Sequence, residues 1–100
     1  MNRETALAIL RAHAAELRQH GVVSASLFGS TARDDARDGS DVDIAVRLTP
    51  GPRGLPHLER MDHLRSALAV LIGRPVDVVE EPTSRRRVQQ EIDRDRRRAF

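Results

Sequence analysis

The chain has 100 residues and no cysteine, which allows one domain with a single core and excludes disulfides and thiolate metal sites. All 17 basic residues are arginine, set against 15 acidic residues, and the formal net charge is +2. No apolar run reaches the roughly 18 residues that suggest a membrane-spanning helix. We therefore expect a cytoplasmic protein of one domain, residues 1–100, without a membrane partner.

The first predicted element is a helix from about Arg3 to His20, with Asn2 as a suitable N-cap. Its apolar residues recur at the spacing of one buried helix face: Leu7, Leu10, Ala14 and Leu17. Gly21 ends this helix, and the apolar run from Val22 to Phe28 then predicts a strand.

The strand stops at Gly29 and Ser30, where we expect the chain to pass into a short helix from Thr31 to about Arg37. A glycine lets the backbone come close to a ligand, and the unpaired amides at a helix start favour anions. Ser30 could add a hydroxyl donor. These features predict a phosphate site at Gly29 and Ser30.

Arg33 lies one helical turn after Ser30 and could reach the same phosphate. The alternative is a surface ion pair of Arg33 with Asp34 or Asp38, both nearby in the sequence. After this helix, Asp38-Gly39-Ser40 is expected to form a turn.

A second strand is predicted from Asp41 to Leu48. Residues two apart in a strand point to the same face, so the Cα atoms of Asp41 and Asp43 should lie about 6.5 to 7 Å apart. Two adjacent carboxylates repel each other and are commonly bridged by a cation, and oxygen ligands suit Mg²⁺ or Mn²⁺. The alternative is an ordinary solvated strand face.

A long helix is predicted from Leu55 to Ile72, followed by a third strand from Val76 to Val79. The predicted buried face of this helix comprises Leu58, Met61, Leu64, Leu68, Leu71 and Ile72. A strand-helix-strand unit gives parallel strands, so Asp77 should lie near Asp41 and Asp43. The alternative is an edge-strand Asp77 that faces water.

The last predicted helix begins at Thr83 or Ser84, ends at about Arg98 and packs through Val88 and Ile92. Its many arginines predict either a solvated helix or a docking surface for an acidic protein or RNA. The order of elements predicts an α+β fold with a small mixed β-sheet covered on one face by helices.

One motif resembles the signature of the polymerase-β-like nucleotidyltransferase superfamily, most closely its minimal nucleotidyltransferase (MNT) branch. The residues that carry the resemblance are Gly29-Ser30, Ala32-Arg33, Ser40, Asp41 and Asp43. The branch often has glycine after the Ala-Arg pair, where this chain has Asp34. Because Asp34 is expected inside the short helix, we interpret this departure as a change of local loop shape rather than of catalysis.

The resemblance implies an antitoxin that transfers AMP from ATP to a tyrosine of a HEPN-type ribonuclease toxin. Asp41, Asp43 and Asp77 would then be the catalytic residues and hold two Mg²⁺ ions, or Mn²⁺. The nucleotide would contact Gly29, Ser30 and Arg33. Neither the nucleotide base nor the acceptor is selected by any residue pattern, and nucleic acid is not expected as a partner. The alternative is a non-catalytic antitoxin that neutralises its toxin by binding alone, in a hetero-oligomer.

Overall fold

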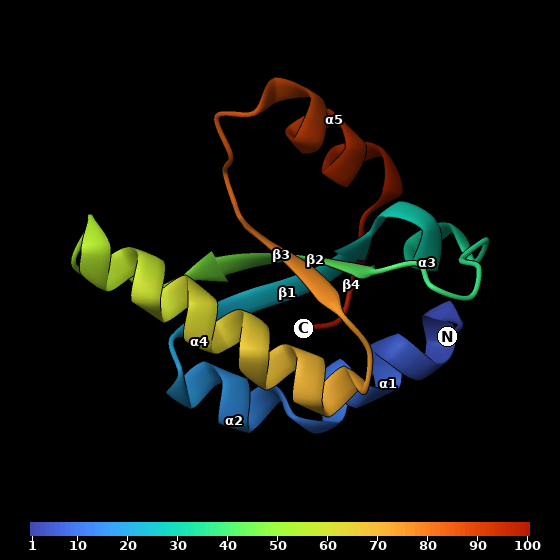
Figure 1. Ribbon diagram of the computed structural model, residues 1–100, viewed down its shortest axis with the longest axis horizontal. Coiled ribbons are helices and arrows are strands. Elements are labelled where there is room, and N and C mark those ends of the chain that lie inside the picture. Colours follow the sequence, from blue (N-terminus) through green and yellow to red (C-terminus); the bar gives the residue numbers. More distant parts are fainter.

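The computed structural model describes residues 1–100 as a four-stranded sheet with helices on both sides (Figure 1). The elements in chain order are α1 (Arg3–Ala12), α2 (Ala14–Gln19), β1 (Val22–Phe28), α3 (Gly29–Arg33), β2 (Val42–Leu48), α4 (Leu55–Ile72), β3 (Val76–Glu80), α5 (Arg86–Asp95) and β4 (Arg97–Arg98). None of the helices combines the length and the apolar composition that crossing a membrane requires.

The sheet has the strand order β3-β2-β1-β4. Strand β1 is antiparallel to both β2 and β4, whereas β2 and β3 are parallel. The long helix α4 connects the two parallel strands, as the strand-helix-strand pattern predicts. The expected α+β class with a small mixed sheet is therefore confirmed.

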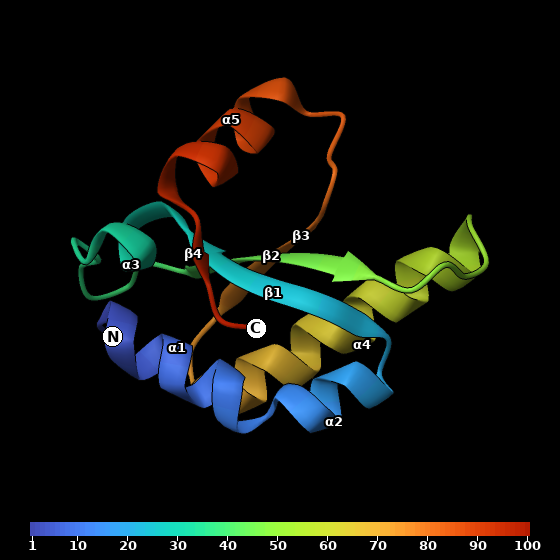
Figure 2. The same ribbon diagram turned by 180° about the vertical axis from the view of Figure 1, so that it is seen from behind.

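The two faces of the sheet carry different layers. Helices α1, α2 and α4 lie along one face, as Figure 1 and the reverse view in Figure 2 show, and α5 stands alone on the other. The larger core contains residues such as Leu10, Leu27, Ile44 and Leu68. A second, smaller core lies under α5 and is formed by Phe28, Ala45, Val79 and Ile92. Helix α5 thus shares its face with the alternate residues of β2, among them Asp43.

The predicted first helix is broken at His13, so the expectation of one helix from Arg3 to His20 is wrong. The apolar face is as predicted, because Leu7, Leu10 and Leu17 are buried. The backbone of His13 leaves the helical range, with φ −105° and ψ 14°. Helix α1 then packs on α3 and α4, while α2 packs against β1.

Helix α4 begins and ends where the sequence predicts, with Gly73 as its left-handed C-cap. Leu64, Leu68 and Ile72 are buried, but Leu58 is 64% exposed, contrary to expectation. The first turns of α4 extend beyond the end of the sheet in Figure 1, which explains why Leu58 has no core to enter.

The C-terminal helix is shorter than predicted. It ends at Asp95, and the next residues form β4, which pairs with Ser26 and Leu27 of β1. Burial of Ala99 and the hydrogen bond from its backbone N to Ala25 O, 2.8 Å, hold the tail along the sheet edge. The predicted continuation of the helix to Arg98 is therefore wrong.

Candidate functional site

A row of residues crosses the sheet at the end where β1 stops and β2 begins. Phe28 of β1 pairs with Asp43 of β2, and Asp43 pairs with Asp77 of β3. The parallel register thus places Asp77 directly beside Asp43, as predicted from the connection between their strands. Asp77 also lies on an edge strand and is exposed to solvent. These are the features of the alternative interpretation, in which Asp77 faces water at the sheet edge.

Gly29 is the residue that lets the turn after β1 approach this row. Its φ is +69°, in the left-handed region, and a Cβ at this position would collide with Oδ2 of Asp43 and lie 3.1 Å from its Cγ. Only glycine fits both the backbone conformation and the carboxylate that lies against it. The carboxylate of Asp43 therefore packs directly against the backbone of Gly29, and the next residue, Ser30, is half-buried.

The carboxyl group of Asp43 is electrostatically unfavourable in its charged form. Burial raises its pKa to about 6, and the negative charges of Asp77, Glu91 and Asp41 act in the same direction. Glu91 comes from α5, which the sequence predicts only as an arginine-rich outer helix. No sequence signal links Glu91 to the site, because its position depends on how α5 packs over the sheet.

Helix α3 is shorter than predicted, since it ends at Arg33 and is capped by Asp34. Asp34 has φ 64°, the left-handed conformation in which glycine is favoured. Its Oδ1 accepts a hydrogen bond from the backbone N of Arg3, 3.0 Å, at the start of α1. The expectation that Asp34 lies inside a helix is wrong, and its side chain connects α3 to α1 instead.

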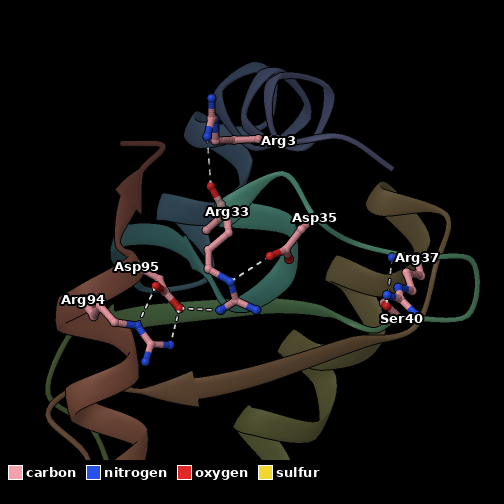
Figure 3. Close-up of polar contacts among 8 residues, drawn as sticks. Arg3, Arg33, Asp35, Arg37, Ser40, Arg94 and Asp95 are labelled. Atoms are coloured by element: carbon pink, nitrogen blue, oxygen red, sulfur yellow. Dashed lines mark hydrogen bonds and ion pairs between the residues drawn. The ribbon is translucent and has the colours of Figure 1, made fainter.

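Arg33 is engaged by carboxylates in this structure (Figure 3). Its Nε donates to Oδ2 of Asp35, 3.2 Å, and its Nη1 donates to Oδ2 of Asp95, 2.8 Å. The ion pairs predicted with Asp34 or Asp38 are therefore not the ones formed. Asp95 is buried and also accepts two hydrogen bonds from Arg94, and these contacts lower its pKa to about 2. Arg33 thereby connects α3 to the end of α5.

Ser40 shapes the turn before β2, as predicted. Its Oγ accepts a hydrogen bond from the backbone N of Arg37, 3.2 Å (Figure 3). Asp41 follows immediately and is exposed. The turn therefore presents Asp41 toward solvent at the entrance to the site.

The donor set fits a divalent cation that shares its coordination with a ligand. The available side-chain ligands are carboxylate oxygens, and the positive charge of Arg33 only partly offsets the burial and the negative neighbours that disfavour the charged form of Asp43. No three Asp, Glu, His or Cys side chains gather closely enough to form a complete metal site. Mg²⁺ commonly uses only one or two carboxylates together with substrate phosphates and water. Asp43 with one neighbour meets that requirement.

Comparison of the sequence with known proteins gives three results. The profile of the nucleotidyltransferase domain family matches residues 10–100. A provisionally named protein adenylyltransferase of Methanocaldococcus jannaschii is 41% identical over 63 residues, and this match spans 63% of each of the two proteins. The protein adenylyltransferase MntA of Thermococcus cleftensis is 40% identical over 72 residues, which are 71% of this chain and 69% of that protein.

Solved structures share the fold. A provisionally assigned minimal nucleotidyltransferase has a TM-score of 0.76 and 33% identity, covering 97% of this chain and 95% of its own. The MNT antitoxin in a complex with a tri-AMPylated HEPN toxin of Shewanella oneidensis has a TM-score of 0.62, covering 94% of this chain and 71% of that one. At 18% identity, the second likeness concerns the fold alone.

Proposed function

Because this chain belongs to the nucleotidyltransferase domain family, we propose that it transfers AMP from ATP to a tyrosine hydroxyl of a partner protein. The observation that carries the proposal is the row in which Asp43 lies beside Asp77 and against Gly29. Carboxylates and a close-approaching backbone are the groups that phosphoryl transfer requires. The relatives that bear the name protein adenylyltransferase support this direction.

The reaction is an in-line displacement at the α-phosphorus. The acceptor oxygen forms a bond to that phosphorus, the bond to the bridging oxygen breaks, and pyrophosphate leaves. The backbone amides of Gly29 and Ser30 and the Ser30 hydroxyl would bind the leaving phosphates. Where Asp77, exposed at the sheet edge, acts as general base instead of holding a metal ion, it would accept the proton of the acceptor hydroxyl.

Asp41 and Asp43 would hold a divalent ion, and Asp77 with Asp43 would hold a second. Such ions neutralise phosphate charge and lower the pKa of an attacking hydroxyl. In the protein itself, burial and then the neighbouring negative charges raise the pKa of Asp43, and a bound cation would favour its charged form. Arg33 would reach a phosphate only by exchanging Asp35 or Asp95 for it, so we assign it a secondary role in binding the nucleotide.

The proposed partner is a HEPN-type toxin that the chain neutralises as its antitoxin. The site lies on the sheet face that carries a single helix, which leaves the exposed Asp41 and Asp77 accessible to a large acceptor (Figure 1). The fold of this chain is also found in a solved complex of an MNT antitoxin with an AMPylated HEPN toxin, which supports a partner of that kind. A folded protein that presents a tyrosine is therefore the acceptor class we propose.

The test uses the purified chain, each labelled nucleoside triphosphate and Mg²⁺, with and without the product of the neighbouring gene. We expect label from ATP on a tyrosine of the partner, identified by mass spectrometry. Asp41→Asn should abolish labelling, whereas Asp38→Asn, which removes a charge from the preceding turn, should retain it. Equal labelling by the two variants would refute the proposed role of Asp41.

A second candidate is an antitoxin that acts by binding alone. It is favoured by the contacts of Arg33, whose guanidinium group pairs with Asp35 and Asp95 and would have to leave one of them to reach a phosphate. It predicts a tight complex of the two proteins with no label on either, and equal neutralisation of the toxin by the wild type and Asp41→Asn.

A further inference from the structure

A polar hollow lies on the α5 face of the sheet, at the opposite end from the aspartates. Its volume is about 390 Å³, and we call it the arginine hollow; its lining residues are Val23, Ser24, Ser26, Arg47, Arg96 and Arg98. Ser24 pairs with Arg47 across β1 and β2, and Ser26 pairs with Ala45 of the small core under α5. These pairs place the hollow on the same face as Asp43.

The side chains that line the hollow are almost entirely hydrogen-bond donors. Arg96 donates through Nη1 to Oε2 of Glu81, 2.8 Å, so its charge is compensated. Arg47 and Arg98 are exposed, and neither forms an ion pair or a side-chain hydrogen bond within the chain. No acidic residue lines the hollow, and Val23 is its one apolar residue. Arg47 acts on Glu81 only through its charge, without a direct ion pair, and the Ser26 hydroxyl is buried and accepts a hydrogen bond from Arg96. The unpaired guanidinium groups of Arg47 and Arg98, together with the Ser24 hydroxyl, match an anion with several oxygen acceptors.

The hollow is separate from the proposed catalytic site. Arg47 lies four residues beyond Asp43 along β2, a Cα separation of about 13 Å in a strand. Ile92 of α5 packs on Phe28 and Ala45, and this small core lies on the same face of the sheet as both sites. The charge also differs, since carboxylates gather at one site and arginines at the other. A ligand of the hollow therefore has its own recognition chemistry.

We propose that the arginine hollow binds a diphosphate group of a small, hydrophilic ligand. A diphosphate supplies two adjacent anionic centres for Arg47 and Arg98, and the volume falls in the range of about 300–1,000 Å³ found for small-molecule sites. Arginine is suited to this role because its planar guanidinium group forms paired hydrogen bonds with phosphate oxygens. The scarcity of apolar lining argues against a site built around a nucleobase.

Arginines also protect an open sheet edge from pairing with another strand, and β4 is such an edge. This purely protective function predicts no saturable binding of anions. The two explanations are thus separated by a direct binding measurement on the intact chain.

The test is calorimetric titration of the chain with inorganic pyrophosphate in the presence of EDTA, which removes binding that depends on divalent ions. Titration with ADP and with AMP then shows whether free diphosphate or a nucleoside diphosphate is preferred. The variant is Arg47→Gln/Arg98→Gln. Its matched control is Arg86→Gln/Arg87→Gln, which removes two exposed arginines of α5 that do not line the hollow.

We expect saturable binding to the wild type, a loss of about tenfold or more in the hollow variant, and a change of no more than about twofold in the control. Asp43→Asn should retain the binding, which separates this site from the catalytic one. Equal losses in the two arginine variants would show a diffuse charge effect and overturn the proposal. Absence of saturable binding to the wild type would overturn it as well.

Discussion

Replacing Asp43 by Asn in the metal-free protein should raise the free energy of unfolding at neutral pH. The folded chain holds the Asp43 carboxyl partly buried beside Asp77, Glu91 and Asp41, and these surroundings raise its pKa from 3.8 to about 6. Charging Asp43 therefore costs more in the folded state than in the unfolded state. Asn keeps the shape of the side chain and removes the charge.

The magnitude follows from the size of this shift. A change of about 2 pKa units at 1.36 kcal/mol per unit sets an upper limit of about 3 kcal/mol, and solvent screening reduces the expected value to about 1–2 kcal/mol. Because the pKa of Asp43 is raised in the folded state, its neutral carboxyl group makes its full contribution to stability below pH 3.8. That contribution is lost as the carboxyl group ionises and the pH rises through about 6. The advantage of Asp43→Asn over the wild type should thus be near zero at about pH 4 and complete at about pH 8.

The assay is urea unfolding of both proteins in EDTA at several pH values across this range. Asp38→Asn is the matched control, because Asp38 is exposed in the turn before β2 and forms no ion pair. The difference between the control and the wild type should not follow the same pH dependence. A constant difference between Asp43→Asn and the wild type from acid to neutral pH would refute the reasoning.

Three further predictions concern the supports of the site. Gly29→Ala should abolish transfer and lower the free energy of unfolding by about 1–3 kcal/mol, because the new Cβ collides with the carboxylate of Asp43. The control for both assays is Gly39→Ala, since Gly39 has a similar positive φ but open space around its Cβ position. Glu81→Gln should lower the free energy of unfolding by about 1–3 kcal/mol in urea, since it leaves Arg96 without its buried charged partner; an unchanged value would contradict a stabilising Glu81–Arg96 ion pair. Asp95→Asn should destabilise the protein at pH 7. The lowered pKa of Asp95 means that its contribution is present above about pH 4 and lost as the pH falls through about 2, so acid titration followed by circular dichroism should show the two proteins converging.

The sequence predicted the main strands and α4 because local signals coincide there. Helix α4 has a proline in its first turn and Gly73 at its end, and both signals are physically tied to helix termini. The position of Asp77 followed from topology, since a helical connection between neighbouring strands makes them parallel. The grouping of Asp77 with Asp43 was therefore predictable without any contact information.

The remaining features depend on packing between distant segments. A strand of two residues has no periodicity, so β4 could not be distinguished from the end of an arginine-rich helix. Glu91 and the contact of Arg33 with Asp95 arise only when α5 is placed over the sheet. The left-handed conformation of Asp34 was not predicted, because glycine is the usual signal for that conformation and the residue here is aspartate.

The ion pair between Glu81 and Arg96 bears on how the segment that carries α5 can vary. These two side chains meet at the points where the chain leaves the sheet before α5 and returns to it afterwards, so they close the base of the segment between them. A segment closed at its base can change in length while the strands keep their register. Insertions within residues 82–85 should therefore leave the sheet intact, as long as Ile92 of α5 keeps its place in the small core.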